Sequence, residues 1–402
     1  MHRRMYFALT CFLICCISAT NGDEIASQTF RTDDNVDKTL AWYQLKQGEF
    51  PPQGAAHAIS GELIRVDHLE RQFYLRVDRD DSQQRGIWDL PIDATMLPYG
   101  AIYYHGAPAA LQDIPLGTHL HGLFYRKAAD DKSPPPPGPY GRATPDVDFN
   151  RCFELEDDFS HNARQQRLWR IDAVDLDEMS LTATLHKQGQ DIGLPLRFDL
   201  LSHTRVFLGN RMEDLNAMEP GTLVQLNITW ATLYGPGRVS DVWLDESSRQ
   251  LASHQQLMRH HNHIRERGLP GWVDAVDDES QVVTITFFGG VDPKLFDELT
   301  GINEEPQGWP FSAGEDDPKA PKGGIAVALE SLMTYDPVND RKGGNILSIT
   351  QGCAEPGSSG IQIKVKCGML LEGFRPRRIV RFYPATWKVQ ALPREEQFFG
   401  RE

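Results

Sequence analysis

The chain of 402 residues lacks the motifs that would assign it to a common class of enzyme. It has no Gly-x-Ser-x-Gly nucleophile motif, no Walker-type phosphate loop, no Gly-x-Gly-x-x-Gly motif and no Cys-x-x-Cys pair. It also lacks a stripe of Lys and Arg, and its formal net charge of −15 argues against binding to a nucleic acid. With 40% hydrophobic and 24% charged residues, the composition is that of an ordinary globular protein.

Long apolar runs are absent except near the N-terminus. The basic stretch at residues 2–4 is followed by an apolar run over Tyr6–Ile17 and by small residues before Asp23. This pattern is typical of a secretory signal peptide and predicts cleavage near residue 22, although Ala19 could equally end the signal. No other stretch reaches the roughly 18 apolar residues that a membrane span needs. We therefore expect a secreted or periplasmic protein without a transmembrane segment after cleavage.

Cysteine is scarce in the expected mature chain, which keeps only Cys152, Cys353 and Cys367. Three thiols are too few for a disulfide scaffold in a chain of this length, so hydrophobic cores must provide the stability. Cys353 and Cys367 flank a Pro-Gly-Ser turn and are a candidate disulfide pair. Cys152 is then expected to be a buried thiol that packs as a small hydrophobe.

A strand-like signature recurs about once every hundred residues. An apolar strand ends in an acidic turn at Ile64-Arg65-Val66-Asp67, Ile171-Asp172-Ala173-Val174-Asp175 and Val273-Asp274-Ala275-Val276-Asp277. Each turn is followed by a second alternating strand, at Gln72–Val77, Ser180–Leu185 and Gln281–Phe287. Alternation and turn chemistry together predict three β-hairpins.

A second signature closes each repeat with an apolar turn, a Gly-Thr bend and another strand. It reads Leu111-x-x-Ile114-x-x-Gly117-Thr118-x-Leu120 in the first repeat and Leu215-x-x-Met218-x-x-Gly221-Thr222-x-Val224 in the second. In the third repeat Arg377-Arg378 replaces Gly-Thr, and a long insertion rich in Gly, Pro and acidic residues precedes it. We expect a short helical turn under a tight bend in each repeat, and an elaborated third module.

Helices are predicted between the repeats, at Ser247–Arg267, Phe159–Arg167 and Thr39–Lys46, with Gly268 ending the first of these. The expected organisation is a signal peptide at residues 1–22, a helix and first barrel at 33–128, a proline-rich loop at 129–145, a second barrel at 146–235, and a linking helix with an elaborated third barrel at 239–392.

This repeated order of strands, acidic hairpin and Gly-Thr bend resembles the small OB-like β-barrel modules of exported bacterial proteins of unassigned function. The resemblance implies a mostly β protein of three tandem OB-like small β-barrels joined by short helices. OB-like barrels often bind oligonucleotides or oligosaccharides on one sheet face, but the fold alone does not fix the function. Given the acidity of the chain, a glycan or a protein of the cell envelope is the more plausible partner.

His119 and His121 are the sharpest candidates for a chemical site, because a spacing of two places both imidazoles on one face of a strand. With His105 they are candidate ligands of a divalent metal, the only cofactor that the sequence suggests. The alternative is that they are ordinary surface residues. The acidic run Glu154–Asp158 is interpreted as a solvated face, and the histidines at 254, 260, 261 and 263 as part of a polar linking helix.

Arg375, Arg377 and Arg381 form a candidate anion patch near the C-terminus. The alternative is that these arginines pair with the surplus carboxylates of the chain itself.

The sequence thus favours a non-catalytic binding or interaction protein of the cell envelope, with its ligand unassigned. Two alternatives stay open, a metal-binding protein that uses the His-x-His strand and a carbohydrate-active enzyme. The second alternative requires two carboxylates about 5 to 10 Å apart in a cleft.

Overall fold

The computed structural model describes residues 56–78, 91–126, 147–229, 237–300, 323–334, 341–367, 370 and 372–397. The expected signal peptide, the helix at Thr39–Lys46 and the proline-rich loop at 129–145 lie outside these ranges. Among the helices that the structure describes, none combines the length and the apolar character needed to cross a bilayer.

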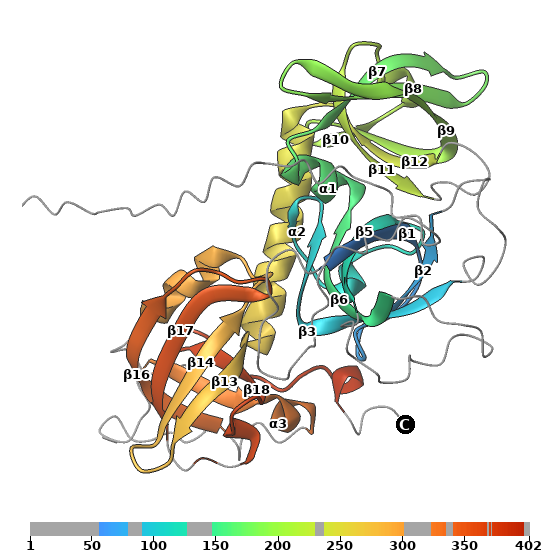
Figure 1. Cartoon of the computed structure of the whole chain (residues 1–402). Coiled ribbons are helices and arrows are strands. Elements are labelled where there is room, and N and C mark those ends of the chain that lie inside the picture. The colour runs from blue at the N-terminus through green and yellow to red at the C-terminus, as the bar shows by residue number, and fades with distance from the viewer. Residues whose placement is uncertain are drawn as a thin grey trace, which may run out of the picture.

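The chain forms three tandem small β-barrels, as the sequence predicts (Figure 1). The first contains β1 (Ala56–Asp67), β2 (Gln72–Val77), β3 (Ile92–Tyr104), β4 (Ala107–Pro108), β5 (His119–Arg126) and β6 (Val147–Asp157). Its strand order is β2-β1-β5-β6-β3-β4, and a further pairing of β2 with β3 closes a barrel of five strands. Only β3 and β6 run parallel, which gives the crossed connectivity of an OB-like barrel.

The second barrel repeats this topology. It contains β7 (Leu168–Asp175), β8 (Ser180–Lys187), β9 (Gln190–Leu208), β10 (Arg211–Glu213), β11 (Leu223–Thr229) and β12 (Arg238–Trp243). The strand order is β10-β9-β12-β11-β7-β8, β9 also pairs with β8, and β9 and β12 run parallel. Strand for strand, this is the order of the first barrel.

The third barrel is elaborated, as expected, and it closes differently. It contains β13 (Leu269–Asp277), β14 (Val282–Phe288), β15 (Gly324–Ala328), β16 (Arg341–Gln351), β17 (Ser358–Cys367) and β18 (Ile379–Pro384). The closed order is β13-β14-β17-β16-β15-β18, and every pairing is antiparallel. A short helix, α3 (Leu329–Met333), follows β15.

The same pair of backbone hydrogen bonds joins the two repeat signatures in each of the three barrels. In the first barrel Gly117 N donates to Leu63 O over 2.7 Å, and Leu63 N donates to Thr118 O over 2.9 Å. The same two bonds link Ile171 to residues 221 and 222, and Val273 to residues 377 and 378. Arg377 adopts φ +75°, close to the values of Gly117 and Gly221, so the third barrel keeps the bend without its glycine.

The module boundaries differ from those expected. β6 and β12 are the last barrel strands of the first and second modules, although β6 follows the proline-rich loop and β12 follows residue 235. The first module therefore extends to Asp157 and the second to Trp243. In the first two barrels the repeated motifs cover the first, second and fourth barrel strands, whereas the fifth strand, β6 or β12, carries no motif that marks it as part of the preceding repeat.

The candidate disulfide between Cys353 and Cys367 is wrong, because both cysteines are free thiols. Gly352 N bonds to Gly360 O at the turn of the β16–β17 hairpin, whereas Cys367 pairs with Gly344 at its far end. Seven residues of strand separate Cys367 from Gly360, about 20 Å at the usual rise, whereas a disulfide requires Cα atoms within about 7 Å. Cys152 is a buried thiol, as expected.

Two helices link the barrels, α1 (Asp158–Arg164) and α2 (Glu246–Arg267). α2 runs from the second barrel past the first to the third (Figure 1), and polar contacts hold it to all three. Arg249 donates to Leu223 O in the second barrel, Ser253 to His105 O in the first, and Arg265 to Glu298 in the third. Gly268 ends the helix at φ +77°, and its N–H donates to Ile264 O over 2.7 Å.

Each barrel has its own hydrophobic core, and a small aromatic cluster joins the first barrel to the third. Tyr99 of β3 lies edge-on to Trp272 and Phe288, with ring centroids 6.3 and 6.2 Å away. Gly290 lies so close to β3 of the first barrel that a Cβ atom at residue 290 would lie 2.7 Å from the Cβ of Ala101. This contact leaves no room for a side chain larger than hydrogen at residue 290.

Where α2 meets the third barrel, we predict a pH-sensitive contact at His260. Its Nε2 accepts a hydrogen bond from Asp292 N over 3.2 Å, and burial, helped by the neighbouring His261 and opposed by Asp292 and Asp113, lowers the pKa of His260 to about 4. The unfolded chain then binds more protons than the folded one between pH 6.5 and 4, so stability falls as the pH falls through this window. The expected loss from this group is about 3 kcal/mol.

Urea unfolding across this pH range tests the prediction. His260→Gln keeps an acceptor for Asp292 N and should flatten the pH dependence of the unfolding free energy. The control His254→Gln alters an exposed histidine of the same helix and should leave that dependence unchanged. Equal pH dependence in the wild type and His260→Gln would contradict the assignment.

Candidate metal centre between the first and second barrels

The two histidines of the His-x-His strand converge on one carboxylate oxygen. His119 Nδ1 lies 2.8 Å from Asp158 Oδ1, and His121 Nε2 lies 2.9 Å from the same atom. His119 is buried in the joint, whereas the side chain of His121 is 24% exposed. Over the part of the chain that the structure describes, these three residues are the one group whose candidate metal-ligand atoms all lie within 4.8 Å of one another.

The start of α1 places Asp158 at this point. Asp157 ends β6 and caps the helix by accepting a hydrogen bond from Ser160 N over 2.9 Å. Asp158 is therefore the first helical residue, and its side chain faces β5. Its second oxygen, Oδ2, accepts a hydrogen bond from Ile228 N of the second barrel over 3.1 Å. The carboxylate is thus held from both barrels.

A second carboxylate orients His119 from its other side. His119 Nε2 donates to Asp78 Oδ2 over 2.7 Å, and Ser60 Oγ donates to the same oxygen over 2.7 Å. In metal sites a ligating histidine usually donates its other ring N–H to a carboxylate or carbonyl group, which fixes the orientation of the ring. Asp78, which directly follows β2, supplies such a carboxylate.

A third histidine flanks His121 without joining the cluster. The ring of His161 stacks on that of His121 with centroids 3.8 Å apart, and its Nδ1 donates to Glu156 over 2.7 Å. Arg164 also pairs with Glu156. Burial raises the pKa of Glu156, but His161 and Arg164 more than offset this effect and lower it overall. The stack fixes one face of the His121 ring.

The charges of the cluster follow from these contacts. Burial disfavours the charged form of His119, but Asp158 and Asp78 outweigh it and raise the pKa of His119 well above its usual value. Burial, together with the nearby His161 and His119, lowers the pKa of His121. Burial also opposes ionisation of Asp158, but the two histidines hold its pKa below the usual range. The cluster therefore combines an ionised carboxylate, a charged imidazole and a neutral imidazole.

The donor set suits zinc or a similar divalent transition metal, which binds imidazole nitrogen and carboxylate oxygen at about 2.0–2.2 Å. Tetrahedral bonds of that length place neighbouring ligand atoms about 3.3 Å apart. The observed nitrogen–oxygen separations of 2.8 and 2.9 Å need to open by only a few tenths of an ångström. A metal would replace the protons on His119 Nδ1 and His121 Nε2.

His105 does not belong to this cluster, contrary to expectation. It lies in the turn after β3 with φ +52°, and its ring packs against Tyr104, Phe159 and Trp243. Burial is the largest cause that lowers the pKa of His105 to about 3. The backbone N–H of His105 donates to the carboxylate of Asp157, and the backbone N–H of Gly209 donates in the same way to Asp245 in the second barrel. His105 thus occupies a turn position where the second barrel has Gly209, and its ring packs in an aromatic cluster outside the group of candidate ligands.

The interpretation of Glu154–Asp158 as a solvated face is also wrong. Glu156, Asp157 and Asp158 are all buried, with at most 7% exposure. Glu156 pairs with His161 and Arg164 of the adjoining helix, whereas Asp157 and Asp158 also bind the second barrel, where Asn227 donates to Asp157 over 2.8 Å and Ile228 N to Asp158 over 3.1 Å. The signal in the sequence that locates Asp158 is the capping pattern Asp157-x-x-Ser160, which also recurs as Asp245-x-x-Ser248 at the start of α2.

The helix histidines are part of a polar linking helix, as expected. His260 accepts from Asp292 N, His261 pairs with the carboxylate of Asp292, and His263 lies 3.5 Å from Gln112. These three side chains contact different groups and do not converge on one point.

The candidate anion patch is not one surface. Arg375 and Arg377 lie in the bend before β18, and only Arg381 lies on the strand. Arg375 pairs with Asp278 over 2.7 Å, as the alternative of pairing with the chain's own carboxylates predicts. Arg381 instead faces a cavity between the first and third barrels.

Two cavities are lined by residues that the structure describes, and neither contains the pair of carboxylates that glycoside hydrolysis needs. The cavity between the first and third barrels contains Glu396 alone, and the cavity beside the start of α2 contains Glu246 alone. A glycosidase needs two carboxyl groups across one cleft.

We predict that the carboxylate of Asp158 is essential to the joint. Asp158→Asn removes a buried charge that His119 and His121 both face, and it should lower the unfolding free energy by about 3 kcal/mol. Urea unfolding measures this loss. Glu178→Gln, which breaks the exposed pair between Glu178 and Arg197, should cost less than about 1 kcal/mol. Equal costs for the two variants would show that the buried network contributes no more than a surface ion pair.

Comparison with known proteins adds no family to this description. No protein-family model, no curated protein and no solved structure matches the chain. The fold is therefore described by its strand order and the site by its geometry.

Proposed function

We propose that the chain is an exported binding protein that holds a divalent transition metal at His119, His121 and Asp158. The observation that carries the proposal is the convergence of two imidazole nitrogens on one ionised carboxylate oxygen, with all three ligand atoms within 4.8 Å. Of the alternatives that the sequence leaves open, metal binding is the one that this geometry favours.

Two features of the cluster support metal binding over a purely structural ion pair. Asp78 holds the second nitrogen of His119, the arrangement that orients ligating histidines in metal sites. The partial exposure of His121 gives an ion a route to the cluster. Three protein ligands also leave one position on a tetrahedral metal open for water or a ligand.

The wider role in this proposal comes from the sequence. The N-terminal pattern favours export, and the acidity of the chain favours a protein or glycan of the cell envelope as partner. A metal with one open position would contribute to such binding through a carboxylate or hydroxyl group of the partner.

Metal binding to the expected mature chain provides the test. After treatment with a chelator and its removal, Zn²⁺ should bind with a stoichiometry near one by titration calorimetry. It should raise the melting temperature, with a stabilisation of about 3 kcal/mol at a hundredfold excess over Kd. His119→Gln combined with His121→Gln should abolish both effects.

Control variants separate this site from other histidines. Combined replacement of the exposed His203 and His254 by Gln should leave the affinity for Zn²⁺ unchanged, as should His105→Asn, since Asn tolerates the left-handed turn conformation. A Co²⁺-loaded protein should show the absorption of a tetrahedral site. Absence of saturable binding by the wild type, or its survival in the double variant at His119 and His121, would refute the metal site.

A further inference from the structure

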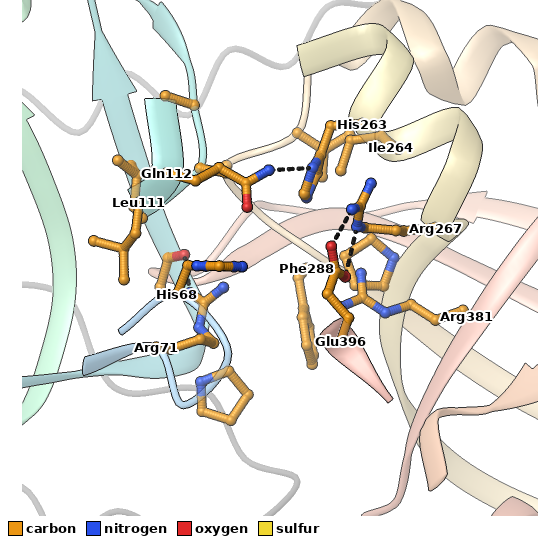
Figure 2. Close-up of a pocket in the computed structure, with 18 of the residues that line it drawn as sticks. His68, Arg71, Leu111, Gln112, His263, Ile264, Arg267, Phe288, Arg381 and Glu396 are labelled. Atoms are coloured by element: carbon orange, nitrogen blue, oxygen red, sulfur yellow. Dashed lines mark hydrogen bonds and ion pairs between the residues drawn. The ribbon is translucent and has the colours of Figure 1, made fainter. Parts of the chain in front are cut away.

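A second site lies on the opposite joint, where the first barrel, α2 and the third barrel enclose a cavity of about 240 Å³. Figure 2 shows polar side chains from each of the three elements pointing into it. His68, Arg71 and Gln112 come from the first barrel, His263 and Arg267 from α2, and Arg381 from β18. This cavity shares no residue with the candidate metal centre.

The cavity contains three arginines and a single described carboxylate. Arg267 donates from Nε to Glu396 Oε2 over 3.0 Å and forms a second bond to the same carboxylate, so this pair is neutral. Arg71 and Arg381 have no ion pair among the described residues. Two positive charges therefore remain on half-buried side chains of an acidic protein, and charged groups that are largely removed from water are seldom left unpaired.

The guanidinium of Arg71 is fixed in place but not satisfied. One of its terminal nitrogens donates to Leu97 O and Gly100 O, each over 3.1 Å, while its buried Nε has no hydrogen-bond partner. Arg71 and Arg381 both line the cavity (Figure 2). A rigid guanidinium with free donors is pre-organised for an anion, because it loses little freedom on binding.

The field in the cavity is positive. Burial is the main cause that lowers the pKa of Arg71 to about 10, and the charge of Arg381 lowers it further. Burial, reinforced by Arg267 and Arg381, lowers the pKa of His263 to about 3. At Arg71 and His263, the neighbouring arginines thus add to the effect of burial.

The barrel fold does not require these arginines. Arg71 occupies a left-handed hairpin position whose carbonyl oxygen accepts a hydrogen bond from Met96 N, and the carbonyl oxygens of Met179 and Gln281 accept the corresponding bonds in the other barrels. Arg381 stands four residues after the bend residue Arg377, where the other barrels have His121 and Gln225. The other barrels have methionine and glutamine at the position of Arg71, and histidine and glutamine at the position of Arg381, so the fold does not need an arginine at either position.

We propose that this cavity binds a phosphate dianion, free or as the monoester of a small organic molecule, between Arg71 and Arg381. Guanidinium groups bind phosphate oxygens through paired, charge-assisted hydrogen bonds. Apolar side chains, among them Leu111, Ile264 and Phe288, line the rest of the cavity and suit the organic part of a monoester. The site is independent of the metal centre.

Titration calorimetry of the full mature chain with inorganic phosphate, in the presence of a chelator, tests the proposal. One saturable site is expected, with an affinity that falls as the salt concentration rises. Glucose 6-phosphate should bind more tightly if a monoester is the natural form, and no more tightly if free phosphate is. Acetate, a monoanion, should bind at least tenfold more weakly than phosphate.

Three variants locate the site. Arg381→Gln should weaken phosphate binding at least tenfold, because it removes charge-assisted hydrogen bonds. Arg375→Gln, which removes an exposed arginine of the same barrel that pairs with Asp278, should leave the affinity unchanged. Glu396→Gln should strengthen binding about tenfold, because it removes the one described negative charge that lines the cavity, although Arg267 keeps its ion pair with Glu266.

The gain in affinity keeps the test independent of folding defects, since an unfolded variant cannot bind more tightly. Lack of saturable phosphate binding by the wild type would overturn the proposal. Unchanged affinity in Arg381→Gln, or no gain in Glu396→Gln, would also overturn it.

Discussion

The carboxylate of Asp157 is the group on which the joint between the first two barrels depends. It is completely buried, and it accepts hydrogen bonds from Ser160 N at the start of α1, His105 N of the first barrel and Asn227 of the second. Burial raises its pKa to about 6 against the effect of these donors. One side chain therefore fixes the end of β6, the start of α1 and the edge of the second barrel, and the direction of Asp158 follows from it.

The parts of the fold that the sequence predicts are those built from local contacts. The bends at residues 117, 221 and 377 and the hairpin turns after Asp67, Asp175 and Asp277 are each formed within a few residues, so their signals repeat along the chain. The closing strands β6 and β12 pair in parallel with β3 and β9, which are distant in the sequence. No local pattern records such a pairing.

In the candidate metal centre, too, the sequence predicts the local part and not the part that depends on distant segments. The spacing of His119 and His121 is visible in the sequence because both lie on one strand. Asp158 lies on another element, and it comes close to His119 and His121 only because β6 pairs with β5. The burial of the acidic run depends on Asn227 and Ile228, roughly seventy residues further on. From the sequence alone, a run of charged residues is interpreted as exposed to solvent, because its distant partners are not visible.

The placement of β6 has a consequence for the order in which the molecule can form. Since β6 begins at residue 147, after the proline-rich stretch at 129–145, and leads without a break into α1, the first barrel stays open until residue 157 has been made. The joint with the second barrel forms later, because Asn227 and Ile228, which bind Asp157 and Asp158, lie about seventy residues further along the chain. Strand pairing between distant segments is slow, so the open edge of the first barrel is exposed to aggregation until β6 has paired.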